Sequence, residues 1–172
     1  RSALVQYSSD GSAWGSSYTP VSGGNTVYVR QIDLAGNTSG VNTLEYTLDT
    51  SSAAPSLALA NDSGGSSTDH ITNDSSLTVT GTEAGAIVQY SSDGSNWNSS
   101  YTPVLDGNTV YVRQIDVAGN TSSTNTLSYV YDTAAAAPTL MLATDTGSSS
   151  TDKITSNPAL TVTGTEAGAT VQ

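Results

Sequence analysis

The stretch NTVYVRQID occupies residues 25–33 and returns without change at residues 108–116. The same separation of 83 residues holds along the whole chain. When residues 1–89 are aligned on residues 84–172, about 63 of the 89 positions are identical. A fixed period of this length is typical of tandem structural repeats, in which each unit contacts only its neighbours. The sequence therefore predicts an array of similar units.

The period also predicts where the units begin and end. Residues 54–136 form a complete unit, residues 1–53 the last part of the preceding one, and residues 137–172 the first part of the next. Each predicted boundary lies at an Asp-Thr…Ala-Pro sequence. On this interpretation neither end segment can close a unit alone. Because exposed strand edges seek partners, we expect head-to-tail association in which the tail of one molecule completes the head of the next.

The complete unit shows strand signals and no helical periodicity. Leu77 and Val79 alternate with threonines, which predicts a strand over residues 77–80. Asp93-Gly94 predicts a type I′ hairpin turn, because that turn needs positive φ at both central residues. The remaining strands are expected at residues 55–60, 86–91, 109–116 and 124–131, with Trp97, Tyr101 and Val104 continuing a further short strand. About seven short antiparallel strands per unit indicate an all-β fold of tandem immunoglobulin-like β-sandwiches.

Composition excludes several classes of function. The formal net charge is −11, so the surface repels nucleic-acid phosphates and anionic membranes. No apolar run approaches the roughly 20 residues of a membrane span. The chain has no cysteine, which removes disulfides, catalytic thiols and thiolate metal sites together.

Several segments together resemble the Ig-like tandem repeats of giant bacterial surface adhesins exported by type I secretion. The segments that carry the resemblance are DT at 132–133 with AP at 137–138, DTG at 145–147 with Asp152 and IT at 154–155, LTVTGTEAGA at 160–169, and DVAGNTS at 116–122. The resemblance implies extender repeats of an extracellular stalk on the bacterial cell surface, serving cell adhesion or biofilm formation. It also implies Ca²⁺ that rigidifies the junctions between units.

Acidic residues are the one set with metal-binding chemistry. The loops of an immunoglobulin-type sandwich gather at its two poles, so units stacked end to end bring acids of neighbouring units together. One junction is expected to gather Asp49, Glu83, Asp116 and Asn120, and the next Asp62, Asp69, Asp132 and Glu166. Such oxygen ligands suit Ca²⁺ better than zinc or magnesium. The alternative is that these aspartates cap turns through their own backbone, as aspartate does routinely.

No catalytic constellation is visible in the sequence. His70 is the single histidine and is replaced by Lys153 in the following unit. The serines lie in no G-x-S-x-G context, and no second histidine is present for a triad. The sequence therefore favours a protein that is not an enzyme.

Aromatic residues leave a second functional reading open. Trp97, Tyr90 and Tyr101 could form a stacking platform for a carbohydrate, which would make the unit a carbohydrate- or receptor-binding module. The competing interpretation is that these side chains are partly buried in the core.

Overall fold

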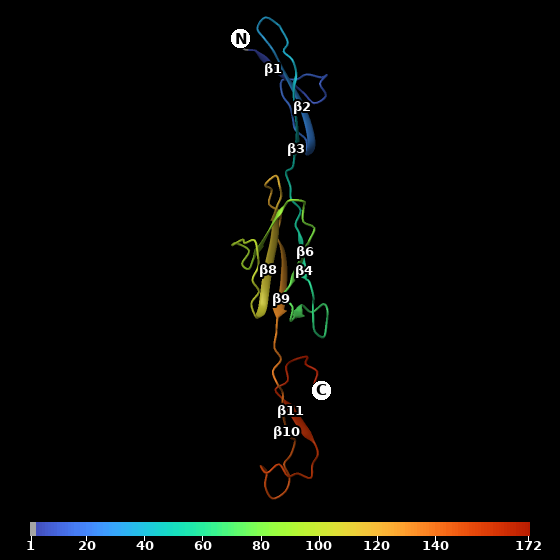
Figure 1. Cartoon of the computed structure of the whole chain (residues 1–172), viewed down its shortest axis with the longest axis vertical. Helices are drawn as coiled ribbons and strands as arrows, with labels where there is room; N and C mark the ends of the chain where they lie inside the picture. The colour runs from blue at the N-terminus through green and yellow to red at the C-terminus, as the bar shows by residue number, and fades with distance from the viewer. Residues whose placement is uncertain (1–2) are drawn as a thin grey trace.

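The computed structural model describes residues 3–172. Figure 1 shows an elongated molecule in which three groups of strands follow one another along the long axis. The described residues contain no helix, and so none long and apolar enough to cross a membrane. Residues 3–172 hold eleven strands: β1 (Leu4–Ser8), β2 (Gly23–Ile32), β3 (Asn42–Leu48), β4 (Ser56–Leu59), β5 (Ile71–Thr72), β6 (Leu77–Thr80), β7 (Ile87–Ser91), β8 (Asp106–Ile115), β9 (Asn125–Tyr131), β10 (Thr139–Leu142) and β11 (Leu160–Thr163). The all-β class is as predicted.

The middle group is built from two layers of strands. One layer is a four-stranded sheet in the order β5-β9-β8-β7, antiparallel except for the parallel pair β5–β9, and the other is the antiparallel pair β4–β6. Leu57, Leu59 and Leu77 of the β4–β6 pair pack against a core formed by Val110, Leu127 and Tyr129. The middle group is therefore sandwich-like, with its core between the two layers.

Strand alternation explains which side chains form this core. Side chains two residues apart point to the same face of a strand, and β8 alternates buried and half-buried residues along most of its length. Val110 and Val112 are completely buried on the inner face. Burying a side chain of this size stabilises a fold by about 1.5–3 kcal/mol. Toward the end of the strand, the next residues of this inward-facing row are the buried polar residues Gln114 and Asp116.

The two end groups repeat parts of the middle group. The sheet β1-β2-β3 has the pairing of β7-β8-β9: Tyr7 faces Val29 across the first pair as Tyr90 faces Val112 in the second. The pair β10–β11 has the register of β4–β6. The predicted unit boundaries fall in strand-free linkers, between β3 and β4 and between β9 and β10.

The Asp93-Gly94 turn differs from its prediction. Gly94 has φ of 73°, but Asp93 is not among the residues of positive φ in the described part of the chain, so a type I′ turn is wrong. The Ser91 hydroxyl accepts bonds from Asp93 N and Gly94 N, and the Asp93 carboxylate accepts bonds from Ser95 N and Asn96 N. These side chains shape a wider loop, which the Tyr90–Asn98 bridge closes.

Two strand predictions were also wrong. No strand forms over residues 97–104 beyond the isolated bridge at Asn98. Conversely, residues 61–74, where no strand was expected, contain β5, whose two residues pair in parallel with Val130 and Tyr131 of β9. Six strands, β4 to β9, therefore lie between residues 56 and 131, where about seven were expected.

Candidate metal centre

The linker between β3 and β4 is tied to the middle group through both backbone groups of Ala53. The carboxylate of Glu83, in the loop between β6 and β7, accepts a hydrogen bond from Ala53 N at 2.8 Å and one from the Ser52 hydroxyl at 3.3 Å. The side-chain amide of Gln114, on β8, donates to Ala53 O at 2.6 Å. Both polar backbone groups of Ala53 are thus bound by side chains of the following unit.

Gln114 joins the hydrogen bonds to Ala53, which together we call the Ala53 clamp, into a single network. Its side chain is completely buried, and its Oε1 accepts a hydrogen bond from Glu83 N at 3.0 Å. A buried amide needs partners for both of its ends, and Gln114 finds one in the linker and one in the β6–β7 loop. Gln114 was not among the predicted site residues. The sequence did offer a sign of this role, because Gln114 follows Val110 and Val112 at every second position and so shares their inward-facing row.

Asp116 and Asn120 hold the linker from the other side. Asp116 Oδ1 accepts a bond from Asn120 N and Oδ2 one from Asn120 Nδ2, both at 2.8 Å. The same Nδ2 also donates to the backbone oxygen of Asp49 at 3.1 Å. The side-chain bond from Asn120 is the main cause that lowers the pKa of the Asp116 carboxyl, so this nearly buried group is ionised at neutral pH.

Three carboxylates converge at this junction. Asp49 follows β3, Glu83 lies between β6 and β7, and Asp116 follows β8, yet one oxygen of each lies within 4.8 Å of the others. Two atoms that each lie about 2.4 Å from one Ca²⁺ are at most about 4.8 Å apart, so the three oxygens are close enough to share a cation. The donors are all oxygen, which suits a hard cation rather than a soft one. This cluster, with Asn120 beside it, is the group that was predicted for the first junction.

The second junction repeats part of the same arrangement. Glu166 accepts a hydrogen bond from Ala136 N at 2.6 Å, as Glu83 does from Ala53, and Asp132 accepts one from Ala134 N at 3.1 Å. Asp132 and Glu166 line one pocket. In residues 3–172 no third carboxylate joins these two.

Asp62 and Asp69 are not brought into a carboxylate cluster within the described residues. Asp62 accepts a hydrogen bond from His70 N at 3.1 Å, and Asp69 accepts one from Ile71 N at 3.0 Å. Both carboxylates thereby stabilise a loop in which His70 has φ of 59°. For these two residues the structure shows turn capping, which was the alternative reading.

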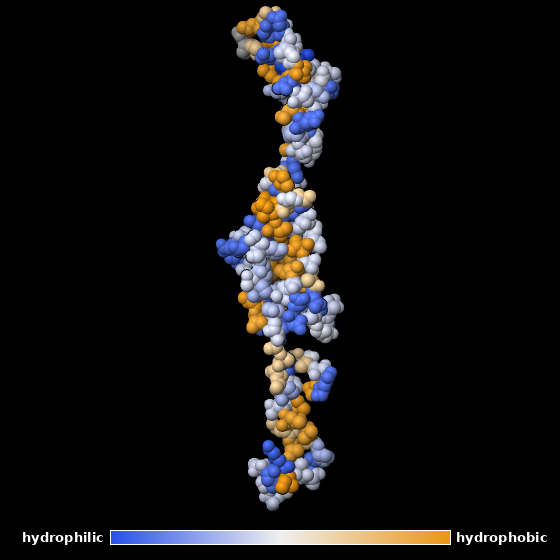
Figure 2. All heavy atoms as spheres, in the orientation of Figure 1, coloured by the Kyte–Doolittle hydropathy of each residue, from blue (hydrophilic) through white to orange (hydrophobic). Residues whose placement is uncertain are grey.

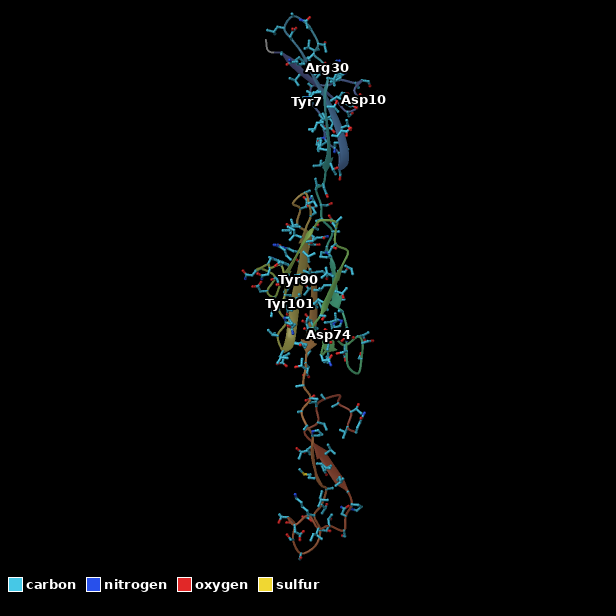
Figure 3. The ribbon with its side chains drawn as sticks, in the orientation of Figure 1. Tyr7, Asp10, Arg30, Asp74, Tyr90 and Tyr101 are labelled. Carbon is cyan, nitrogen blue, oxygen red and sulfur yellow. The ribbon has the colours of Figure 1, made fainter. Side chains whose placement is uncertain are left out.

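The three aromatic residues of the carbohydrate reading do not share a face. Tyr90 and Tyr101 lie side by side (Figure 3), line one pocket and pack against the core. Trp97 instead stacks on Arg113, whose guanidinium carbon lies 4.0 Å from the ring centroid. Arg113 pairs with Gln89, and both neighbour residues of the inner row on their strands, so they point away from the core. Trp97 is therefore separated from the two tyrosines by the sheet.

Searches for similar proteins found no protein-family model that matches the chain and no curated protein similar to it.

Proposed function

We propose that the chain is a structural extender: stalk repeats of a secreted bacterial surface adhesin that support cell adhesion or biofilm formation outside the cell. The role is mechanical rather than catalytic. The observation that carries the proposal is the linker between the first two strand groups, which is bound at Ala53 and Asp49 by side chains of the following unit. A linker held in this way keeps successive units in line, as a stalk requires.

The fold supports the same role. We read the middle group as an immunoglobulin-type sandwich, with β4–β6 as one layer and β5-β9-β8-β7 as the other. The middle unit has its own small core, and the three groups of strands follow one another along one axis (Figure 1). Arrays of this kind gain stability additively and serve reach and spacing. The net charge of −11 keeps a long array soluble.

Calcium at the junction completes the proposal. Asp49 comes from the preceding unit, whereas Glu83 and Asp116 come from the following one, so a cation bound by all three joins the two units. Converging carboxylates repel one another when no cation is present. Three carboxylates offer up to six of the 6–8 oxygens that Ca²⁺ takes, and water can supply the rest.

A calcium titration of the whole chain tests this proposal. The chain is first stripped with a chelator and kept dilute, and then Ca²⁺ is added while thermal unfolding and small-angle scattering are recorded. We expect Ca²⁺ to raise the unfolding temperature and to narrow the distribution of end-to-end lengths. A Ca²⁺ concentration 100 times the Kd stabilises the folded state by about 2.7 kcal/mol.

The chain offers a matched control for this titration. Asp33 is the counterpart of Asp116 and accepts the same local bonds, from Asn37 N and Asn37 Nδ2, but lies outside the carboxylate cluster. Asp116→Asn should abolish the response to Ca²⁺ in dilute solution, and Asp33→Asn should leave it intact. An Asp116→Asn chain that responds normally would remove the metal site. Scattering that Ca²⁺ does not change would remove the rigidifying role.

A further inference from the structure

The chain contains three Asp-Gly dipeptides, at residues 10–11, 93–94 and 106–107. An Asp-Gly bond can rearrange without an enzyme, because glycine has no Cβ that hinders attack of its backbone nitrogen on the preceding carboxyl group. The attack requires that the glycine nitrogen, the carboxyl group and the space around them are all free. The hydrogen bonds and contacts of residues 3–172 differ at the three dipeptides in these respects.

The dipeptide Asp93-Gly94 is held in place on every side. Gly94 N donates to the Ser91 hydroxyl at 2.9 Å, and Asn96 binds both carboxylate oxygens of Asp93, through N at 2.8 Å and through Nδ2 at 2.7 Å. The bond from Asn96 N is the main cause that lowers the pKa of the Asp93 carboxyl, so the group is ionised and a poor target for a nucleophile. A Cβ at Gly94 would lie 3.7 Å from the Tyr111 ring.

The dipeptide Asp10-Gly11 in the first unit is held in the same way. Gly11 N donates to the Ser8 hydroxyl at 2.9 Å, and the Asp10 carboxylate accepts a bond from Ala13 N at 2.8 Å. That backbone bond is the main cause that lowers the pKa of the Asp10 carboxyl. A Cβ at Gly11 would lie 3.8 Å from the Tyr28 ring. Both reacting groups of this dipeptide are therefore engaged.

The dipeptide Asp106-Gly107 has none of these restraints. Asp106 is exposed, and within residues 3–172 its carboxylate accepts no hydrogen bond, since the bond from Asn108 Nδ2 goes to its backbone oxygen. A Cβ at Gly107 would meet no atom within 4 Å. The preceding Val104 and Leu105 are 60 % and 63 % exposed, and they belong to the apolar residues on the surface of the middle group (Figure 2). The turn therefore stands clear of the body of the unit.

The Gly107 nitrogen is also free of the strand ladder. Gly107 faces Val130 of β9, but Val130 N donates to His70 O on the opposite side of β9. Paired residues of an antiparallel ladder alternate between exchanging hydrogen bonds and exchanging none, so the Gly107 N–H points away from β9. On that side β7 ends at Ser91, which faces Tyr111. The nitrogen therefore meets no neighbouring strand.

We propose that Asp106 is a site of spontaneous isomerisation, at which the α-aspartyl linkage to Gly107 becomes a β-aspartyl linkage. The Gly107 nitrogen forms a bond to Cγ of the protonated Asp106 side chain and loses its proton, which leaves with the side-chain hydroxyl as water. The product is a five-membered succinimide. Addition of one water then breaks one of its two bonds from carbon to nitrogen. Breaking the bond to Cγ restores Asp106, and breaking the bond to the backbone carbonyl carbon leaves isoaspartate.

Isomerisation alters a corner of the middle group that Asn108 holds. Asn108 is buried, its Nδ2 donates to Val104 O at 2.7 Å and to Asp106 O at 3.0 Å, and its Oδ1 accepts a bond from the Tyr101 hydroxyl at 2.7 Å. In isoaspartate the Asp106 carbonyl becomes a free carboxylate outside the main chain, and a methylene enters the backbone two residues before Asn108. The corner is distorted, so we expect the middle group to be less stable.

The first unit has the same corner without the reactive group. Gly23 takes the place of Asp106 and Asn25 that of Asn108, and Asn25 Nδ2 donates to Gly23 O at 2.9 Å. The backbone is similar, with φ of 92° at Gly23 and 72° at Asp106. A residue with a Cβ is disfavoured at such φ, and the added methylene of a β-linkage releases that restraint. The two units therefore provide a reactive and an inert version of one turn.

Ageing of the whole chain in neutral buffer made with oxygen-18 water, with a chelator present, tests the proposal. Peptides are mapped with fragmentation that distinguishes isoaspartate from aspartate. We expect isoaspartate at Asp106 that carries one heavy oxygen, formed at least about tenfold faster than at Asp93 or Asp10, because attack there must first break hydrogen bonds. In urea, where the fold is lost, the three rates should become similar. No isoaspartate at Asp106, equal rates in the folded chain, or isoaspartate without heavy oxygen would overturn the proposal.

Three variants test the turn itself. Asp106→Glu keeps the charge but would need a larger ring, and Asp106→Gly recreates the turn of the first unit, so both should stay unmodified. Gly23→Asp should create a second reactive site, and its failure to react would contradict the assigned turn geometry. After ageing, the unaltered chain should unfold at lower urea than the Asp106→Glu chain. Equal stability despite isoaspartate would overturn the effect on the Asn108 corner.

Discussion

The carboxylate of Glu83 accepts a hydrogen bond from the backbone N–H of Ala53, 2.8 Å away and thirty residues earlier in the chain. The contact crosses from the middle group to the linker, so it orders the junction whether or not a cation is bound. Glu83 therefore has two separable roles, as an acceptor for the linker and as a charge in the acidic cluster.

Substitutions of Glu83 separate these roles. Glu83→Ala removes the acceptor, and we expect amide hydrogen exchange at Ala53 to accelerate by about tenfold or more, because a hydrogen bond to a charged group contributes about 1.5–3 kcal/mol. Glu83→Gln keeps an acceptor oxygen, so exchange at Ala53 should change little while Ca²⁺ binding weakens. Glu166→Ala is the control, since it releases Ala136 and not Ala53. Equal exchange at Ala53 in all chains would disprove the clamp.

Gln114 offers a second prediction with an internal control. Gln114→Ala leaves Glu83 N and Ala53 O without their partner inside the fold. Two lost hydrogen bonds of about 0.5–1.5 kcal/mol each should lower the free energy of unfolding of the middle group, measured in urea, by about 1–3 kcal/mol. Gln31→Ala alters the same residue on the exposed counterpart sheet and should change stability by less than about 0.5 kcal/mol. Similar effects of the two substitutions would contradict the burial difference.

Gln31 and Gln114 also show what the sequence could and could not predict. Each lies in one of the two identical copies of the stretch NTVYVRQID, so the local pattern predicted a strand at both places. Strands β2 and β8 confirm this prediction. Local pattern cannot tell that one glutamine is exposed and the other buried, because the second layer, β4 and β6, comes from residues more than thirty positions earlier in the chain. For the same reason β5 was missed: its two residues are defined by their pairing with β9 and not by any local alternation.

The candidate site divides along similar lines. Asp49, Glu83 and Asp116 were predicted together because the fold class places their loops at one pole, and the structure brings them together. Asp62 and Asp69 were assigned to the second junction by the same reasoning, but short-range bonds to His70 N and Ile71 N hold them within their own loop. The fold class predicts which loops lie at one end of the sandwich, but hydrogen bonds within each loop determine where its carboxylates point.

Alkaline unfolding should report on Tyr129. Its hydroxyl is buried with no hydrogen-bond partner, and burial raises its pKa from 10.0 to about 12. A group whose pKa is raised in the folded state stabilises the fold below its unfolded pKa and loses that contribution as pH rises through the folded value. Stability should therefore fall by about 2 kcal/mol between pH 10 and pH 12.

Tyr129→Phe isolates this effect. The substitution removes the titrating hydroxyl and breaks no hydrogen bond, so stability at pH 7 should be unchanged or slightly higher, and the alkaline loss should become shallower. Urea unfolding at intervals from pH 8 to pH 12, with phenolate absorbance recorded in parallel, measures both quantities. An alkaline limb that is identical in the two chains would show that Tyr129 is not the group responsible.

Trp97 decides between the stalk and a carbohydrate-binding module. One face of its indole is covered by the Arg113 guanidinium, which is itself held by a bond from Nε to Gln89 Oε1 at 3.0 Å. Tyr90 and Tyr101 pack toward the core on the other side of the sheet, so neither of these two rings can join Trp97 in holding a sugar. We expect no saturable change in Trp97 fluorescence on addition of neutral oligosaccharides to a Trp14→Phe chain.

The same chain provides the positive and negative controls for that experiment. Arg113→Ala uncovers the indole, so its emission should shift without any sugar, because the cation no longer lies over the ring. Arg30→Ala alters the equivalent pair of the first unit, and with Trp14 absent it should leave the emission unchanged. A saturable sugar-dependent shift in the chain that retains Arg113 would favour the binding module, since it would require Trp97 to contact ligand while the guanidinium remains stacked on it.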